Sequence, residues 1–441
     1  MKRIYTSLIS FVVCSIFGSA SQLTWNGSEK SVISVTVPSA TGLEEVCVAD
    51  GLTGLSVSFP ATSASEIKWS RYSNLGGGYA EEITTGISFA NGKSVLNKID
   101  GDMGYIVETA GQQYCFWVVD YSRHRFSVAS ISESAEKDCS FLTLDVNGNG
   151  EEIVYYGING RRFTLDRDLK LSYRTLTEDF ENITFAELKC EDTYPSFSRT
   201  LSVVAPLCST DFTLSGDRFL REWGEEVSVA SNEISPYAVK SITLAVQTER
   251  DADNEVESGS GGSTFGGSAP CVVNFEAAVT DGAVFKEWQF SRQEDFEDIS
   301  LRIQELNIQY TFTEEGLTYV RFVCANAEGK CESYSDVFTI SIGTSSLKCP
   351  NVFSPNGDGI NDEWKVSYSS IVDFECYIFD RYGHKLATLT DPSQGWDGKR
   401  NGKVVPTGAY YYVIKARGAD GKSYDCSGDI NIVSYNSSVR Q

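Results

Sequence analysis

The sequence predicts an all-β protein in which several antiparallel β-sandwich domains follow one another. Apolar and polar residues alternate with a period of two in many short runs, which is typical of half-buried antiparallel strands. SVISVTV (31–37), SITLAVQ (241–247) and VFTISIG (337–343) are three such runs, and Gly-rich turns such as NLGGGY and NGNGE separate runs of this kind. Helical periodicity is scarce; residues 291–307 fit either a short helical turn or a long loop.

The first 20 residues have the features of a secretory signal peptide. Lys2 and Arg3 form a basic start, an apolar run (8–17) follows, and small residues precede a cleavage point after Ala20. Cys14 raises the alternative of a lipoprotein, but a bulky valine precedes it where a lipoprotein motif takes a small residue. No later stretch approaches the roughly 18 apolar residues of a membrane-spanning helix. We therefore expect an exported chain of about 420 residues, too long for a single core.

Charge and cysteine content restrict the partners and the compartment. The chain has 37 Lys and Arg residues against 60 Asp and Glu residues, a net charge of −23, and removal of Lys2 and Arg3 lowers it to −25. Nucleic acid is excluded as a partner because phosphate binding needs a basic face. Eleven cysteines remain without Cys14. Export favours disulfides, and the odd number leaves at least one thiol without an intramolecular partner.

Two Cys–Trp–Cys patterns indicate Ig-like sandwiches, in which a Trp packs against a disulfide that joins the two sheets. The first pattern contains Cys47, Trp69 and Cys115, and the second contains Cys271, Trp288 and Cys324. The alternative is that these are unrelated core residues. Cys331 competes for the partner of Cys324. Further candidates for one bridge in the middle of the chain are Cys139, Cys190 and Cys208.

The expected organisation follows from these patterns and from one composition shift. Residues 249–267 form an acidic and then Gly/Ser-rich stretch without periodicity, which predicts a flexible linker. The expected boundaries are 1–20 for the signal peptide, 21–134 for an Ig-like sandwich, 135–205 for a small β module, 206–248 for a further β module or a continuation, 249–267 for the linker, 268–345 for a sandwich and 346–437 for the last domain.

Residues 268–345 resemble the PKD family of β-sandwich modules. The resemblance rests on WQF (288–290) and on the residues Tyr310, Gly316, Tyr319, Val320 and Asn326. The Gly-Asp-Gly that usually follows the first strand of the family is missing, so the match is loose. It implies a spacer or interaction module without catalysis.

The last domain begins with FSPNGDGIND (353–362), in which Asn-Gly and Asp-Gly are turn dipeptides whose glycines tolerate positive φ. A WDG turn, a PTG turn and the strand AYYYVIKA (409–416) follow. These pieces resemble the gliding-motility-associated C-terminal domain, the type B sorting domain of the type IX secretion system in Bacteroidetes. The matching residues are Phe353, Pro355, Asn356, Gly357, Asp358, Gly359, Asn361, Asp362, Trp396, Asp397, Gly398, Pro406, Gly408 and Tyr410. Cys376 and Cys426 are candidates for a bridge within this domain.

The resemblance implies a route and partners. A domain of this family is recognised by the type IX translocon and commonly stays at the cell surface through an outer-membrane partner protein. We therefore expect an extracellular or outer-membrane-attached protein. Binding or adhesion is the leading function, with an unidentified glycan or protein as the ligand. A structural part of a surface or motility assembly is the alternative, and a secreted hydrolase is the third.

Metal and catalytic chemistry have weaker support. Asn356, Asp358, Asn361 and Asp362 offer oxygen donors for calcium, but Asx turns explain the same composition. DVNGNGEE (145–152) starts like an EF-hand loop and lacks its closing carboxylate, which favours a β-turn between two strands. No GxSxG, HExxH or P-loop motif occurs, and neither histidine adjoins a nucleophile motif. The sequence therefore predicts no enzyme and no cofactor.

Overall fold

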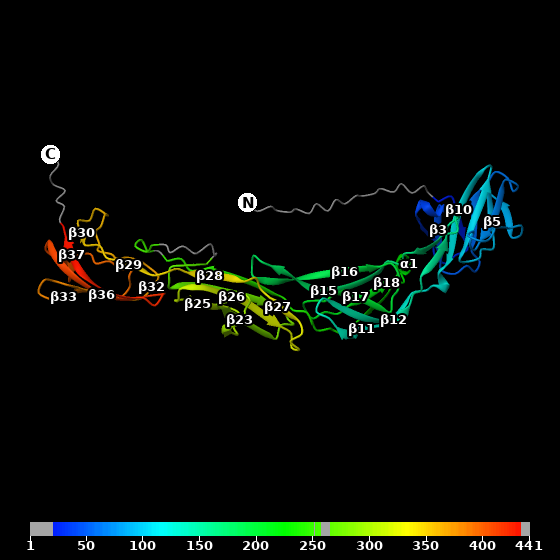
Figure 1. Cartoon of the computed structure of the whole chain (residues 1–441). Coiled ribbons are helices and arrows are strands. Elements are labelled where there is room, and N and C mark those ends of the chain that lie inside the picture. Colours follow the sequence, from blue (N-terminus) through cyan, green and yellow to red (C-terminus); the bar gives the residue numbers. More distant parts are fainter. Residues whose placement is uncertain (1–20, 251, 257–264, 434–441) are drawn as a thin grey trace, which may run out of the picture.

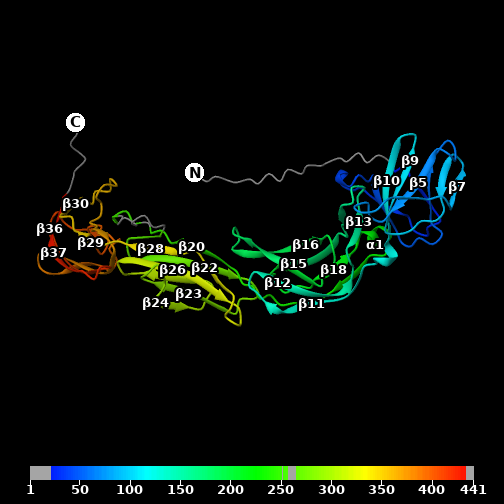
Figure 2. The same ribbon diagram turned by 45° about the vertical axis from the view of Figure 1, so that its right-hand side comes forward.

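A computed structural model describes residues 21–250, 252–256 and 265–433. The expected signal peptide and Cys14 lie outside these residues. The described chain is almost entirely β and forms four modules along a bent line (Figures 1 and 2). We define them as the first (21–126), second (127–236), third (237–345) and fourth (346–433) modules. The predicted fold class, tandem antiparallel sandwiches, is confirmed.

The first module is a sandwich of a four-stranded and a six-stranded sheet. The six-stranded sheet is apolar on both faces: in β3 and β10 consecutive residues are buried, because one face packs on the four-stranded sheet and the other on the second module. The four-stranded sheet contains β1 (Thr24–Asn26), β4 (Ser56–Pro60), β8 (Lys93–Leu96) and β7 (Ile87–Ala90). The six-stranded sheet contains β2 (Ile33–Val35), β3 (Glu45–Ala49), β10 (Gln112–Asp120), β9 (Met103–Thr109), β5 (Ile67–Tyr72) and β6 (Glu81–Glu82). Two 3₁₀ turns are η1 (Ser39–Thr41) and η2 (Tyr121–Arg123).

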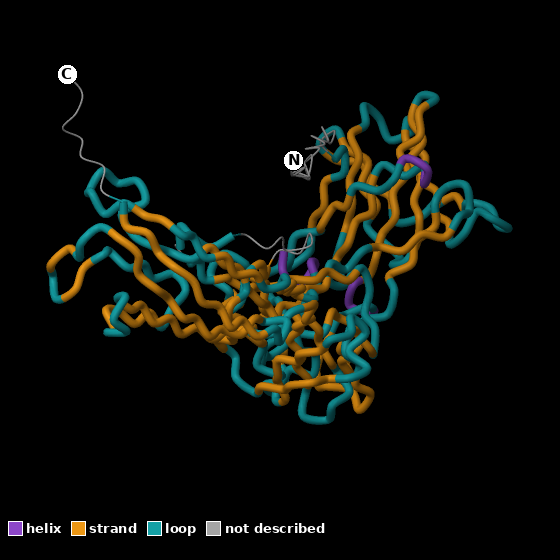
Figure 3. The backbone as a smooth tube through the Cα atoms, turned by 60° about the vertical axis from the view of Figure 1, so that its left-hand side comes forward, coloured by secondary structure: helices purple, strands orange, loops and turns teal. Residues whose placement is uncertain are grey.

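The second module shares one hydrophobic core with the first, so the expected boundary between them does not separate two cores. A single module also covers most of the two shorter β modules expected at 135–205 and 206–248, because β15 pairs with β18 across that boundary. Its strands are β11 (Ser127–Lys137), β12 (Phe141–Asn149) and β17 (Thr200–Val204) in one sheet, β16 (Thr184–Tyr194), β15 (Leu169–Asp179), β18 (Thr213–Gly216) and β19 (Val227–Ala230) in a second, and β13 (Ile153–Tyr156) with β14 (Arg162–Leu165). The helix α1 (Arg218–Glu222) lies at the joint with the first module (Figure 1), and Figure 3 shows how little helix (purple) stands among the strands (orange).

The third module begins earlier than its sequence resemblance indicates. β20 (Ser241–Gln247), the whole of the predicted run SITLAVQ, pairs with β22 (Cys271–Val279) across the stretch expected as a linker. Residues 291–307 contain neither a helical turn nor an uninterrupted loop, because β24 (Ile299–Ile303) lies within them. The remaining strands are β25 (Ile308–Phe312), β21 (Phe265–Gly267), β28 (Phe338–Ile342), β26 (Gly316–Ala325), β23 (Phe285–Ser291) and β27 (Glu332–Tyr334).

The fourth module has its own core beneath a five-stranded sheet. That sheet contains β30 (Val352–Phe353), β37 (Ser423–Ile432), β36 (Gly408–Gly418), β32 (Ile371–Phe379) and β33 (Lys385–Leu389). Short pairs are β29 (Ser346–Lys348) with β31 (Ser367–Ser369) and β34 (Lys399–Arg400) with β35 (Lys403–Val404). Within the ranges given above, no helix has the length and apolar character needed to cross a membrane.

Candidate functional site

The loop FSPNGDGIND closes around its own last carboxylate. Asp362 accepts hydrogen bonds from the backbone N–H groups of Asn356 (2.9 Å), Gly357 (2.6 Å) and Gly359 (2.7 Å). Gly357 and Gly359 have φ values of 80° and 83°, which other L-residues rarely adopt. These N–H donors, that of Gly357 first, lower the pKa of Asp362. The two Gly residues and the final Asp of the motif therefore act together: the glycines allow the backbone to turn, and the backbone amides bind the Asp362 carboxylate.

The other predicted calcium donors of this loop hold its turns. Asn356 and Asp358 hydrogen-bond to each other, side chain to side chain, at 3.0 Å, and Asn361 has a left-handed backbone with φ 52°. In the part of the chain that the structure describes, no group of three or more His, Cys, Asp or Glu side chains is placed to hold a metal ion. Calcium binding here stays a prediction.

The aromatic residues of the matched motif meet beneath the loop. The ring of Trp396 lies 5.6 Å from that of Phe353 and 5.4 Å from that of Tyr410, centroid to centroid. Gly398 has φ 70°, and a Cβ there would lie 3.0 Å from Pro355 and 3.2 Å from Phe353. The motif thus packs two distant segments, around 353 and 396, onto β36.

The remaining motif residues fix the turn before β36 and the WDG turn. The Tyr410 hydroxyl donates to the carbonyl of Pro406 at 2.7 Å, and Gly408 opens β36 with φ 148°. Asp397 forms an ion pair with Lys399 at 2.8 Å, and this contact lowers the pKa of Asp397. The motif residues therefore form one contiguous end of the fourth module, and most of them have a structural role.

The three predicted disulfides are wrong. Cys47 aligns with Val118 in the parallel pair β3–β10, so Cys115, an odd number of residues away, points to the opposite face of the sheet. Cys376 and Cys426 both pair with Ile414 of β36 and so flank it on the two neighbouring strands. All four thiols are free.

Cys271 and Cys324 are also free, because they lie at opposite ends of the third module. Cys324 contacts Ser241, which pairs with the far end of β22, eight residues from Cys271. Burial raises the pKa of Cys324 to about 11 and that of Cys376 to about 12. These thiols are core side chains with little thiolate character at neutral pH.

The observed disulfide joins Cys139 and Cys331, 192 residues apart, and links the second module to the third. Their spacing carried no signal, because the two cysteines belong to different modules. The second and third modules have separate cores, and few other contacts cross this joint. One is the ion pair between Lys240 and Glu178, at 2.8 Å. The disulfide thus adds a second covalent link, besides the backbone itself, to a joint that has no shared core.

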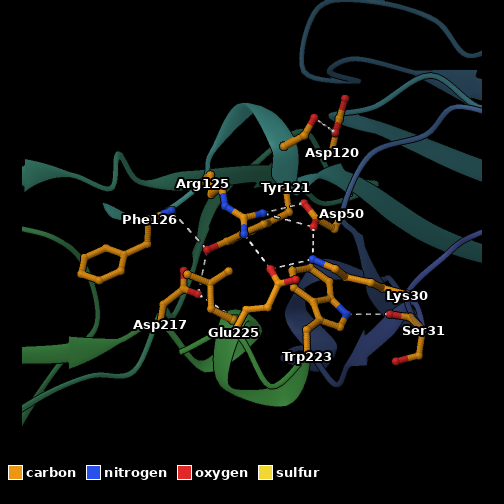
Figure 4. Close-up of polar contacts among 12 residues, drawn as sticks. Lys30, Ser31, Asp50, Asp120, Tyr121, Arg125, Phe126, Asp217, Trp223 and Glu225 are labelled. Carbon is orange, nitrogen blue, oxygen red and sulfur yellow. Dashed lines mark hydrogen bonds and ion pairs between the residues drawn. The ribbon is translucent and has the colours of Figure 1, made fainter. Parts of the chain in front are cut away.

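The joint between the first and second modules has ion pairs at its surface, which Figure 4 shows, and one further ion pair at its buried centre. Arg167 and Asp217 form an ion pair at 2.6 Å, and neither side chain is exposed to solvent. Asp217 also accepts from the Tyr121 hydroxyl at 2.9 Å and caps α1 through the N–H of Leu220. Lys30 and Arg125 each pair with both Asp50 and Glu225 at the surface.

Part of the expected linker is an ordered contact between the third and fourth modules. The Asn254 amide donates to the carbonyls of Val366 (2.7 Å) and Pro392 (2.8 Å), and the N–H of Val256 donates to Tyr368 at 2.7 Å. Asp253 pairs with Lys365 at 3.1 Å. Residues 253–256 therefore extend the small β29–β31 sheet of the fourth module. Residues 265–267 of the expected linker form β21, and residues 251 and 257–264 lie outside the described residues.

Two family models match parts of the chain. The CHU_C type IX secretion signal domain matches residues 347–432, and a fibronectin type III domain (Fn3_FA) matches residues 130–231. The predicted sorting domain is confirmed: the fourth module is a type IX secretion signal domain, preceded by an Ig-like domain of the fibronectin type. The signal indicates export to the cell surface or beyond it.

Similar solved structures include a tetra-tandem repeat from the extending region of a large adhesion protein, with 12% identity and a TM-score of 0.22, over 88% of this chain and 98% of that one. Dimeric latent PorU from Porphyromonas gingivalis has 10% identity and a TM-score of 0.16, over 73% of this chain and 35% of that one. A Ca²⁺-stabilised, ice-binding adhesin of an Antarctic bacterium has 12% identity and a TM-score of 0.18, over 95% and 100%. No curated protein matches the chain in sequence.

Proposed function

We propose that the chain is a surface adhesin: the type IX translocon exports it, an outer-membrane partner retains it, and the three modules before the signal domain bind a ligand. The secretion signal at 347–432 is the observation that carries the proposal. The architecture supports it, because stacked sandwiches hold loops and sheet faces on a firm frame away from the point of attachment. In this proposal the protein binds its ligand and does not convert it.

Export is tested by deletion and by transfer. We expect the chain without residues 346–441 to be made but to stay protected from protease added to whole cells, whereas the full chain is digested. In the transfer arm, residues 346–441 are fused to an exported fluorescent protein. Because residues 253–256 pack on the fourth module, a second fusion starts at residue 237 and keeps that contact.

Both arms are run in a bacterium with a type IX system and in a strain that lacks the translocon. The proposal requires surface fluorescence only in the first strain. If the chain without residues 346–441 still reaches the surface, the fourth module is not the sorting signal. If the full chain stays at the surface and no outer-membrane protein co-purifies with it, the proposed retention by such a partner is wrong.

A further inference from the structure

A polar hollow lies on the outer face of β11 and β12 in the second module. Asp145, Asn147 and Asn149 are exposed at alternate positions of β12, whereas Leu144 before them and Val146 between the first two are buried. The segment DVNGN is therefore strand, and the β-turn expected over 145–152 is wrong: residues 150–152 connect β12 to β13 without a turn. The spacing that suggested an EF-hand loop places three polar side chains on one face.

Neighbouring strands add to the same face. Ser127, Ser130 and Ser132 of β11 lie directly opposite Asn149, Asn147 and Asp145. Arg199 enters from the start of β17, where its carbonyl accepts from the N–H of Val146 at 2.8 Å. Together these residues line a hollow of about 400 Å³.

Two local features make room for the hollow. The pairing of β11 with β12 shifts between Val128 and Ser130, so that Ala129 is an extra residue and the strand bends. Gly148 lies between the two Asn residues, and a Cβ there would lie 2.4 Å from the carbonyl oxygen of Ser127. The NGN sequence therefore reflects a position that only glycine fits.

The polar side chains of this hollow are free to bind a ligand as far as the described part of the chain is concerned. Among the residues that the structure describes, no hydrogen bond or ion pair engages the side chains of Asp145, Asn147, Asn149, Arg199, Ser127, Ser130 or Ser132. The hollow on the outer face of the third module differs: Gln289 there bonds to Glu287 (2.7 Å) and to Arg321 (2.9 Å), and Arg302 also pairs with Glu287.

The free groups match one class of ligand. Asp145 offers acceptors, Arg199 offers a fork of donors, and the amides and hydroxyls offer both. Their charges cancel, and the exposed side chains include no large apolar group that could anchor an apolar peptide. Saccharides fit this description, because the adjacent hydroxyl groups of a sugar ring both donate and accept hydrogen bonds and carry no charge.

We propose that the hollow formed by Asp145, Asn147, Asn149, Ser130, Ser132 and Arg199 is a saccharide-binding site. This inference rests on the proposed adhesive function and gives it a location and a ligand class. Asp145 and Arg199 bind the sugar hydroxyls at one end of the hollow, and the two Asn amides farther along β12 fix the orientation of the ring.

The test uses the full exported chain on an array of neutral hexose, N-acetylhexosamine and uronic acid oligosaccharides. Titration calorimetry with the best-bound oligosaccharide then compares the wild type with Asp145→Ala, Asn147→Ala and Arg199→Ala. Each substitution is expected to weaken binding about tenfold or more, as for hydrogen bonds to charged or fixed polar groups. Arg161→Ala is the matched control, because Arg161 is also exposed and no ion pair engages it among the described residues. Melting temperatures should not change, since no hydrogen bond or ion pair within the described residues engages the replaced side chains.

The outcomes separate this inference from the adhesive function. Loss of sugar binding in the three variants but not in Arg161→Ala supports the site. If sugar binding survives all three substitutions, the sugar binds elsewhere. The hollow is then not the saccharide site, and the proposed adhesive function stands. Binding of the chain to cells or to a peptide library, with no sugar bound, overturns the saccharide class only. A chain that binds none of these probes removes both proposals.

Discussion

The buried ion pair at the first joint allows a quantitative prediction. Asp217→Ala removes the charge that faces Arg167 at 2.6 Å, together with the acceptor of Tyr121 and the cap of α1. Because Arg167 is fully buried, the substitution leaves an unpaired charge inside the shared core. Breaking a buried pair on one side costs about 3–5 kcal/mol. The free energy of unfolding of the first two modules should fall by that amount.

Urea unfolding of the full exported chain, followed by tryptophan fluorescence, measures the change. Asp217→Asn keeps the size and the cap acceptor but not the charge, so it should cost less than Asp217→Ala. Glu152→Ala is the control, because Glu152 pairs with Arg162 at 2.8 Å at the surface, where such pairs contribute about 0–1 kcal/mol. Replacing both buried partners, as in Arg167→Met with Asp217→Leu, should recover much of the loss. If Asp217→Ala costs no more than Glu152→Ala, the argument that this pair holds the joint is refuted.

Three further predictions concern the other modules. Cys331→Ser, or reduction, removes a cross-link over 192 residues, which is worth about 5 kcal/mol in a chain-entropy treatment. Small-angle scattering of the Cys331→Ser variant should show a looser joint between the second and third modules, whereas Cys208→Ser should leave the scattering profile unchanged. Identical profiles for the two variants would contradict the prediction. Gly398→Val should destabilise the fourth module by about 1–3 kcal/mol and lower its melting temperature, because Gly398 has φ 70° and Phe353 and Pro355 leave no room for a side chain. Gly402→Val is the control for the steric contribution, because Gly402 also has positive φ but lies in an open turn. Asp362→Asn should destabilise the fourth module at neutral pH. Because the folded pKa of Asp362 is lowered, its contribution is present above the ordinary Asp pKa of about 3.9 and is lost as the pH falls through the lower folded value. A difference in melting temperature from wild type that does not shrink as the pH falls below the ordinary Asp pKa would rule out this cause.

Local patterns predicted local structure well. The alternation in SITLAVQ defines a strand with the same limits, Ser241–Gln247, because alternation records burial on one face. The sorting motif was found because its turns need glycine at fixed positions, and Gly357, Gly359 and Gly398 all have positive φ. Where one residue type satisfies one backbone requirement, sequence alone identifies the element.

Pairing between distant segments was not predictable in the same way. β20 belongs to the third module because it pairs with β22, across a stretch whose composition resembles a linker. The bridge between Cys139 and Cys331 depends on how two modules meet, which no spacing records. Asp145, Asn147 and Asn149 were singled out by their EF-hand-like spacing, but their two-residue period also fits one face of a strand. That period was the signal that could have revealed the hollow.

The three joints are held by different chemistry, and this sets how the string of modules responds to its surroundings. The first joint depends on a shared apolar core and the second on a disulfide, whereas the third depends on direct packing and hydrogen bonds between its modules, those of residues 253–256 among them. We therefore expect a reducing environment to act on the second joint, while the other two keep their geometry. We expect oxidation outside the cytoplasm to close the joint between the proposed saccharide site and the secretion signal, so that the spacing between the two is fixed only once the chain has left the cytoplasm.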